Sequence, residues 1–117
     1  MKLRPGHIEL FVRDPIQAKD FYSALGFRVE EIQLEKFVWM NHDGMTILLR
    51  PQRTADAPST YQDAPSGIVI YTDNLSDARK ELESKGIAFK GTDGSDFCLT
   101  FTDPDGNWFQ LVNPDAH

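Results

Sequence analysis

The chain is poor in cysteine, in long apolar runs and in positive charge. Its 117 residues include one cysteine, Cys98, which excludes an intramolecular disulfide and fits a reducing compartment. No apolar stretch approaches the roughly 20 residues of a membrane-spanning helix. Residues 1–6 also lack the apolar stretch of a signal peptide. These absences predict a cytoplasmic protein with no membrane partner.

Acidic residues outnumber basic ones, 18 to 12, which gives a net charge of −6. Such a chain lacks the basic face that nucleic-acid binding requires. The charge mildly favours neutral or cationic small molecules as partners. Hydrophobic residues make up 40% of the sequence, as in globular proteins. The length is enough for one compact core, so we expect residues 1–117 to form a single domain.

The sequence contains an internal repeat. Residues 7–14 are echoed by residues 67–74, at an offset of 60, and the turn-forming segment 41–44 is echoed by 103–106, at an offset of 62. A repeat of this size implies two similar modules that face each other across a pseudo-twofold axis. It also identifies which positions of the two modules are equivalent, and therefore where a shared site would lie.

Each repeat predicts a strand, a helix and three further strands. Residues 7–12 alternate with a period of two, typical of a strand, and Asp14 and Pro15 suit the cap and first position of a helix that Gly26 ends. In the second module either Asn74 or Ser76 would cap the helix. The strands expected after the helices are residues 27–31, 36–40 and 45–50, then 87–90, 97–102 and 107–112. The predicted fold class is α+β, with module one at 5–50, a linker or surface loop at 51–66 and module two at 67–114.

Two motifs carry a family resemblance. Asp-x-x-x-Ala-x-x-Phe-Tyr-x-x-Leu-Gly-Phe begins at Asp14, and Asp-Pro-Asp-Gly-Asn-x-x-x-Leu begins at Asp103. With the two βαβββ units, they resemble the vicinal oxygen chelate superfamily, which includes glyoxalase I, extradiol dioxygenases and bleomycin-resistance proteins. The resemblance implies two half-barrels of four strands, a curled eight-stranded sheet around a cavity, and a homodimer. The fold hosts many activities, so function must be argued from the site.

The resemblance places one metal ligand on the first strand and one on the fourth strand of each module. The matching positions are His7 and Leu48 in module one, and Gly67 and Gln110 in module two. Only His7 and Gln110 are able to coordinate through side chains, whereas catalytic metal sites typically keep three protein ligands. No catalytic residue is therefore assigned. A divalent metal is disfavoured, although His7 stays open to three interpretations: a structural histidine, a ligand contact or a metal ligand.

Strand parity assigns the residues that would line the cavity. They are His7, Glu9, Phe11, Trp39, Leu48, Arg50, Gly67, Tyr71, Trp108 and Gln110. The register of Trp39 is the least fixed of these, and Glu9 and Arg50 are alternatively a structural ion pair. Residues of the opposite parity are expected to form the core under the helices: Ile8, Leu10, Ile47, Leu49, Ile68, Ile70, Phe109 and Leu111.

Aromatic side chains with a few polar groups are typical of a pocket for a small, flat or partly apolar molecule. The leading hypothesis is a cytoplasmic dimer that sequesters an antibiotic or metabolite, in the manner of bleomycin-resistance proteins, without a cofactor. The first alternative is a metal-dependent glyoxalase-, lyase- or dioxygenase-like enzyme. The second is an interaction module with a vestigial cavity. The sequence does not identify the ligand, the pairing of modules within or between subunits, or whether residues 51–66 form a lid.

Overall fold

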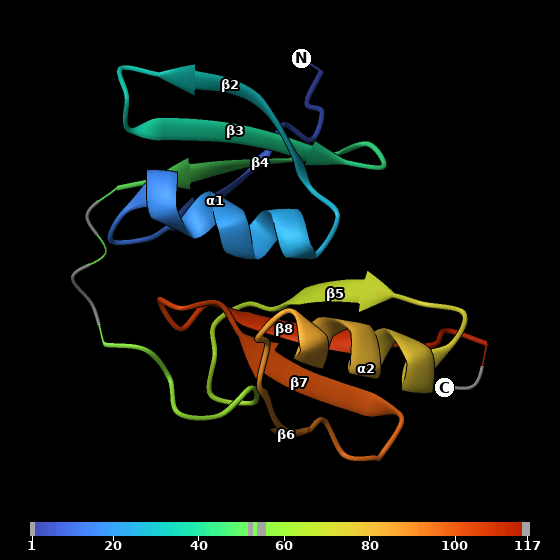
Figure 1. Cartoon of the computed structure of the whole chain (residues 1–117). Coiled ribbons are helices and arrows are strands. Elements are labelled where there is room, and N and C mark those ends of the chain that lie inside the picture. The colour runs from blue at the N-terminus through green and yellow to red at the C-terminus, as the bar shows by residue number, and fades with distance from the viewer. Residues whose placement is uncertain (1, 52, 54–55, 116–117) are drawn as a thin grey trace. The chain divides into compact units, whose positions relative to one another are not determined.

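The computed structural model describes residues 2–51, 53 and 56–115 (Figure 1). The chain forms two compact units, Met1–Thr54 and Ala55–His117. The division falls inside the segment predicted to be a linker, 51–66. Each unit contains one βαβββ module, and residues 56–66 belong to the second unit.

Module one forms a four-stranded sheet with one helix. Its elements are β1 (Ile8–Phe11), α1 (Pro15–Ala24), β2 (Arg28–Gln33), β3 (Phe37–His42) and β4 (Met45–Arg50). The strand order is β1-β4-β3-β2, with β1 parallel to β4 and the other pairs antiparallel. Because β4 lies between β1 and β3, side chains of the N-terminal strand β1 are presented together with those of the later hairpin β3–β4.

Module two repeats this topology. Its elements are β5 (Ile68–Tyr71), α2 (Leu75–Ser84), β6 (Phe89–Thr92), β7 (Cys98–Thr102) and β8 (Trp108–Val112), and the sheet order is β5-β8-β7-β6. The predicted α+β class and the two βαβββ modules are confirmed. The eight strands form two hydrogen-bonded sheets of four, one in each module.

Both helices begin where the sequence predicts. The Asp14 carboxylate accepts from the backbone N–H groups of Ile16 and Gln17, at 3.1 and 3.3 Å. In module two Asn74, rather than Ser76, is the cap, and it accepts from Asp77 N–H at 3.0 Å. Asp and Asn satisfy N–H groups that have no partner within the helix. No helix in the described residues is long and apolar enough to cross a membrane.

Most of the predicted core is buried, but the outer strands are not fully covered. Leu10, Ile47, Leu49, Phe109 and Leu111 are buried. In contrast, Ile8 is 40% exposed, and Ile68 and Ile70 are only half-buried, so the prediction was wrong for Ile8 and incomplete for the other two. The reason is position: β1 and β5 are the outermost strands of their sheets and have a strand neighbour on one side only.

The turn between β7 and β8 is held by one buried carboxylate. Asp103 is 2% exposed, and its Oδ1 accepts from the backbone N–H groups of Asp105 and Asn107, at 2.9 and 2.8 Å. Its Oδ2 accepts from Asn107 Nδ2 at 2.8 Å. The Asp-Pro-Asp-Gly motif therefore forms the hairpin turn that its composition indicates. The Asp103 carboxylate stabilises this turn by accepting hydrogen bonds from its backbone N–H groups.

Candidate functional site

Three strands bring predicted site residues of module one into one row. Leu48 on the inner strand β4 pairs with Glu9 of β1 on one side and with Trp39 of β3 on the other. Side chains of directly paired residues point to the same side of a sheet. Glu9, Leu48 and Trp39 therefore share a face, and the register of Trp39, which the sequence left open, is settled in favour of this side.

Glu9 connects two other predicted site residues of this module. Arg50 Nη1 donates to Glu9 Oε1 at 2.9 Å, and His7 Nε2 lies 2.8 Å from Glu9 Oε2. The hydrogen bond from Arg50, and then the one from His7, lower the pKa of Glu9 from its ordinary value of 4.5. Glu9 is consequently a carboxylate at neutral pH and only accepts, so His7 Nε2 carries the proton. Glu9 and Arg50 therefore form the ion pair that the sequence left open as an alternative.

Aromatic rings surround this ion pair. The Trp39 ring lies 4.6 Å from the ring of His7, edge to face, and Trp39 Nε1 donates to Gln33 Oε1 at 2.9 Å. The Arg50 guanidinium lies over the ring of Phe11, at 5.5 Å. These contacts fix the orientation of the Trp39 and Phe11 rings beside the ion pair.

Two members of this face were missed by sequence reasoning. Phe37 lies on β3, and its ring is 5.8 Å from the guanidinium of Arg50. Gln33 pairs with Phe37 across β2 and β3. Parity along β3 would have found Phe37, two residues before Trp39, but Gln33 depends on a register that contains a bulge. We call the following residues the module-one face: His7, Glu9, Phe11, Gln33, Phe37, Trp39, Leu48 and Arg50.

The predicted site residues of module two are placed differently. Trp108 and Gln110 are buried, 5% and 7% exposed, whereas Tyr71 is 71% exposed. Trp108 Nε1 donates to the backbone oxygen of Pro58 at 2.8 Å. Gln110 Nε2 donates to Asp93 Oδ2 at 3.2 Å. The fourth residue, Gly67, lies against the ring of Tyr61. Residues from the predicted linker therefore cover the equivalent face of module two.

The side chains at the four positions that the family resemblance assigns to metal ligands do not fit a divalent metal. In module one Leu48 has no donor atom, and one nitrogen of His7 is bound to Glu9. In module two Gly67 has no side chain, and the Gln110 amide is bound to Asp93. Among the described residues, no group of three or more His, Cys, Asp or Glu side chains is arranged to hold a metal ion. The donors that remain are the Nδ1 atom of His7 and a neutral amide oxygen, which is fewer than a catalytic metal site requires.

Two βαβββ modules with this strand order define the glyoxalase and bleomycin-resistance class of folds. The chain belongs to the Glyoxalase/Bleomycin resistance protein/Dioxygenase superfamily, whose family model matches residues 4–111. The resemblance read from the two motifs is thereby confirmed. No curated protein sequence matches the chain.

Solved structures share the fold at low sequence identity. The hypothetical protein SA1046 from S. aureus has a TM-score of 0.75 and 19% identity, over 97% of this chain and 95% of that one. FosX from Listeria monocytogenes, a fosfomycin resistance protein in complex with Mn(II) and sulfate, has a TM-score of 0.74 and 16% identity, over 97% and 91%. A bleomycin-binding protein in complex with bleomycin has a TM-score of 0.67 and 15% identity, over 95% and 98%. At these identities the likeness establishes the fold alone.

Proposed function

We propose that this chain binds and sequesters a small organic ligand, an antibiotic or a metabolite, on the module-one face, and that it needs no cofactor to do so. The observation that carries this proposal is the cluster of Trp39, Phe11 and Phe37 around an ion pair that is already satisfied. A ligand that stacks on these rings meets little unpaired charge, so it gains apolar contact at a low desolvation cost.

The expected ligand is flat and aromatic, and neutral or cationic. Arg50 is neutralised by Glu9, so the face offers an anion little attraction. The net charge of −6 of the whole chain also disfavours anionic ligands. A bleomycin-binding protein has the same fold, and this supports, by analogy of fold alone, binding of a small organic molecule. Cytoplasmic location belongs to this proposal and fits the single cysteine.

Emission of Trp39 tests the proposal. Bleomycin and the flat cationic dye proflavine are titrated into the protein while tryptophan emission is recorded. We expect saturable quenching with at least one of them, and loss of that signal in Trp39→Phe. Phe11→Ala should weaken binding about ten-fold, since it removes one ring of the face and its contact with Arg50.

The matched control is Phe97→Ala. Phe97 is an exposed phenylalanine of module two, outside the module-one face, and its loss should leave binding unchanged. If Phe11→Ala and Phe97→Ala weaken binding equally, the ligand does not use this face. If no aromatic compound alters tryptophan emission, the sequestration proposal is wrong.

The second candidate is a metal-dependent enzyme of the same superfamily. One observation favours it: the carboxylate of Glu9 orients the ring of His7, as carboxylates orient metal-binding histidines elsewhere. Among the described residues Nδ1 of His7 has no hydrogen-bond partner, so it is the atom that would face a metal or a ligand. We rank the metal-dependent enzyme second because the four positions offer only two atoms that could coordinate a metal ion.

A homodimer is also part of the proposal. Val29 and Ile32 of β2, the outermost strand of the module-one sheet, are each more than two-fifths exposed, and a second copy that packs against this edge would cover them. Light scattering during gel filtration should give twice the mass of one chain, 13.3 kDa. A monomer at micromolar concentration would contradict this part of the proposal.

A further inference from the structure

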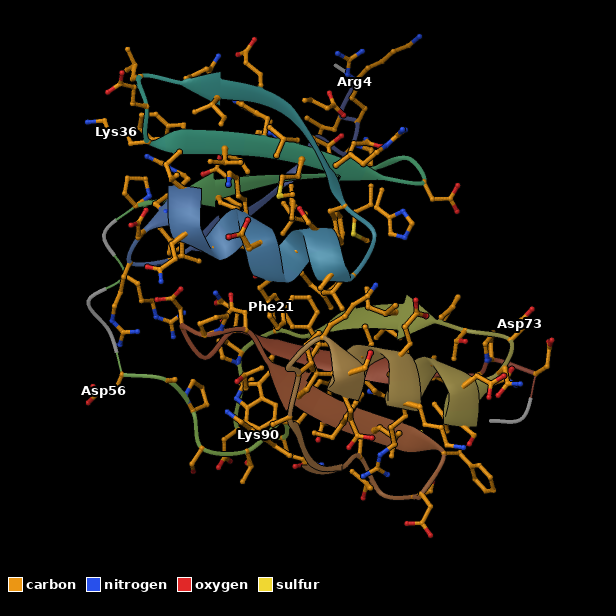
Figure 2. All side chains as sticks on the ribbon, in the orientation of Figure 1. Arg4, Phe21, Lys36, Asp56, Asp73 and Lys90 are labelled. Carbon is orange, nitrogen blue, oxygen red and sulfur yellow. The ribbon has the colours of Figure 1, made fainter. Side chains whose placement is uncertain are left out.

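Residues 57–62, which we call the strap, occupy the face of module two that carries Gly67, Trp108 and Gln110. Figure 1 draws this segment in light green, and Figure 2 labels Asp56 just before it. The centre of the Tyr61 ring lies 6.3 Å from that of Trp108, nearly perpendicular to it at 83°. The ring fills the space above Gly67 so closely that a methyl group there would lie 2.6 Å from Tyr61 Oη. At the far end of the strap, Ala57 packs against Gly106.

The strap also satisfies the polar groups of this face. Its Pro58 carbonyl accepts from the buried indole N–H of Trp108 at 2.8 Å. Its Gln62 amide donates to Asp93 Oδ1 at 3.1 Å, while Asp93 Oδ2 accepts from Gln110. A buried indole N–H needs an acceptor. If the strap moved away, Trp108 would therefore take an acceptor from water or from another molecule.

The strap thus presents the features of a ligand: an aryl ring, a carbonyl oxygen beside it and a carboxamide. Each meets a complementary feature of the face, namely the space over Gly67, the N–H of Trp108 and the carboxylate of Asp93. We propose that this face is a binding site for an aryl compound with a carbonyl acceptor, such as an arylamide, and that the strap is its intramolecular occupant. The site concerns module two alone and does not depend on ligand binding at the module-one face.

This arrangement has a quantitative consequence. A ligand that binds only when the strap is displaced has its apparent affinity reduced by the fraction of molecules in which the face is open. Removing the Tyr61 ring raises that fraction and leaves a space of the same shape. An added tyrosine analogue should then fill the space that the variant creates.

The experiment follows the indole N–H signals of the two tryptophans by NMR, assigned with Trp39→Phe. The probe is N-acetyltyrosinamide, which supplies both the aryl ring and the carbonyl. In Tyr61→Ala we expect the Trp108 signal to shift saturably, with a dissociation constant about ten-fold or more below that of the unmodified protein. The Trp39 signal reports on the module-one face and the Trp108 signal on module two. The same spectra therefore test the two binding proposals independently.

Phe97→Ala is the control, because Phe97 is an exposed aromatic residue of module two that makes none of the strap contacts described above. It should behave as the unmodified protein does. Tyr61→Val carries the test if Tyr61→Ala does not fold, because it also removes the ring. Gly67→Ala should not bind the probe in either background, since its methyl group would fill the space that the aryl ring needs. Equal Trp108 shifts with and without Tyr61, or none in the folded open variants, would overturn the proposal.

Discussion

Arg50 Nη1 and Glu9 Oε1 lie 2.9 Å apart, although 41 residues separate them in the sequence. The contact joins β4 to β1, and Glu9 extends it to His7 through its second oxygen. Glu9 therefore orients two neighbouring side chains and is not a free base. A proton acceptor in catalysis needs a pKa near the working pH, whereas these hydrogen bonds move the pKa of Glu9 away from it.

Replacing Arg50 should raise the pKa of Glu9. In Arg50→Gln the guanidinium that lowers this pKa most is lost, so the value should rise toward 4.5 in a carboxyl-carbon NMR titration. A carboxyl whose pKa is lower in the folded than in the unfolded state stabilises the fold above the unfolded pKa. That contribution disappears as the pH falls through the folded pKa, so Arg50→Gln should weaken the dependence of stability on pH below 4.5.

The control for this titration is Arg79→Gln. Arg79 lies on α2, where it pairs with Glu83 at 3.6 Å, so its loss should leave the pKa of Glu9 unchanged. Salt provides a second check. The side chains of Arg50 and Glu9 are 41% and 35% exposed, so added salt should reduce the shift in the pKa of Glu9. A pKa of Glu9 that does not respond to Arg50→Gln would contradict the assignment of its cause.

Asp103→Ala should destabilise the protein far more than Asn41→Ala. The two residues occupy equivalent positions of the repeat, but Asp103 is buried and accepts two backbone hydrogen bonds, whereas Asn41, a half-buried residue of β3, accepts one from Gly44 at 3.4 Å. Hydrogen bonds to a charged group contribute roughly 1.5–3 kcal/mol. We expect a loss of that size in the free energy of unfolding for Asp103→Ala, measured in urea, and less than about 1 kcal/mol for Asn41→Ala. If the two variants lose equal free energies of unfolding, burial of the Asp103 carboxylate does not strengthen its hydrogen bonds.

The elements of this fold were predictable because their signals are local. A period of two predicts β1, and the cap at Asp14 with Pro15 after it predicts the start of α1. The ends of the strands were less certain: β2 and β3 run to Gln33 and His42, two residues beyond the predicted ends, because ladder hydrogen bonds and a bulge determine their limits. Parity also placed Glu9 and Arg50 on one face, which made their pairing predictable.

The packing of the strap on module two could not be predicted from the sequence. Residues 51–66 have no apolar periodicity, so they read as a linker. The contacts of Pro58 with Trp108 and of Gln62 with Asp93 connect residues 50 and 31 positions apart, and no local pattern specifies them. One signal was present in the repeat itself. Gly67 stands where module one has His7, and a glycine at such a position indicates that another group approaches the backbone closely.

Asp14→Ala should lower the free energy of unfolding by about 1 kcal/mol. The change leaves two N–H groups of the first turn of α1, those of Ile16 and Gln17, without their acceptor. Asp20→Ala removes an aspartate from the same helix whose side chain is 81% exposed, and it should change stability by less than about 0.5 kcal/mol. Chemical denaturation of both variants gives the comparison, and equal stabilities would contradict the capping role.

The last prediction separates a binding protein from a metalloenzyme. Protein purified without chelator and then dialysed should retain far less than one divalent metal per chain, because His7 offers one nitrogen and Gln110 a neutral oxygen. Elemental analysis after exposure to zinc, nickel, manganese and iron measures this, with His7→Ala and His42→Ala in parallel. His42 is the control because its ring packs against Phe27 at 5.4 Å, outside the module-one face. Near-stoichiometric metal that is lost in His7→Ala but kept in His42→Ala would reverse the order of the two proposed functions, since the second nitrogen of His7 would then be a metal ligand oriented by Glu9.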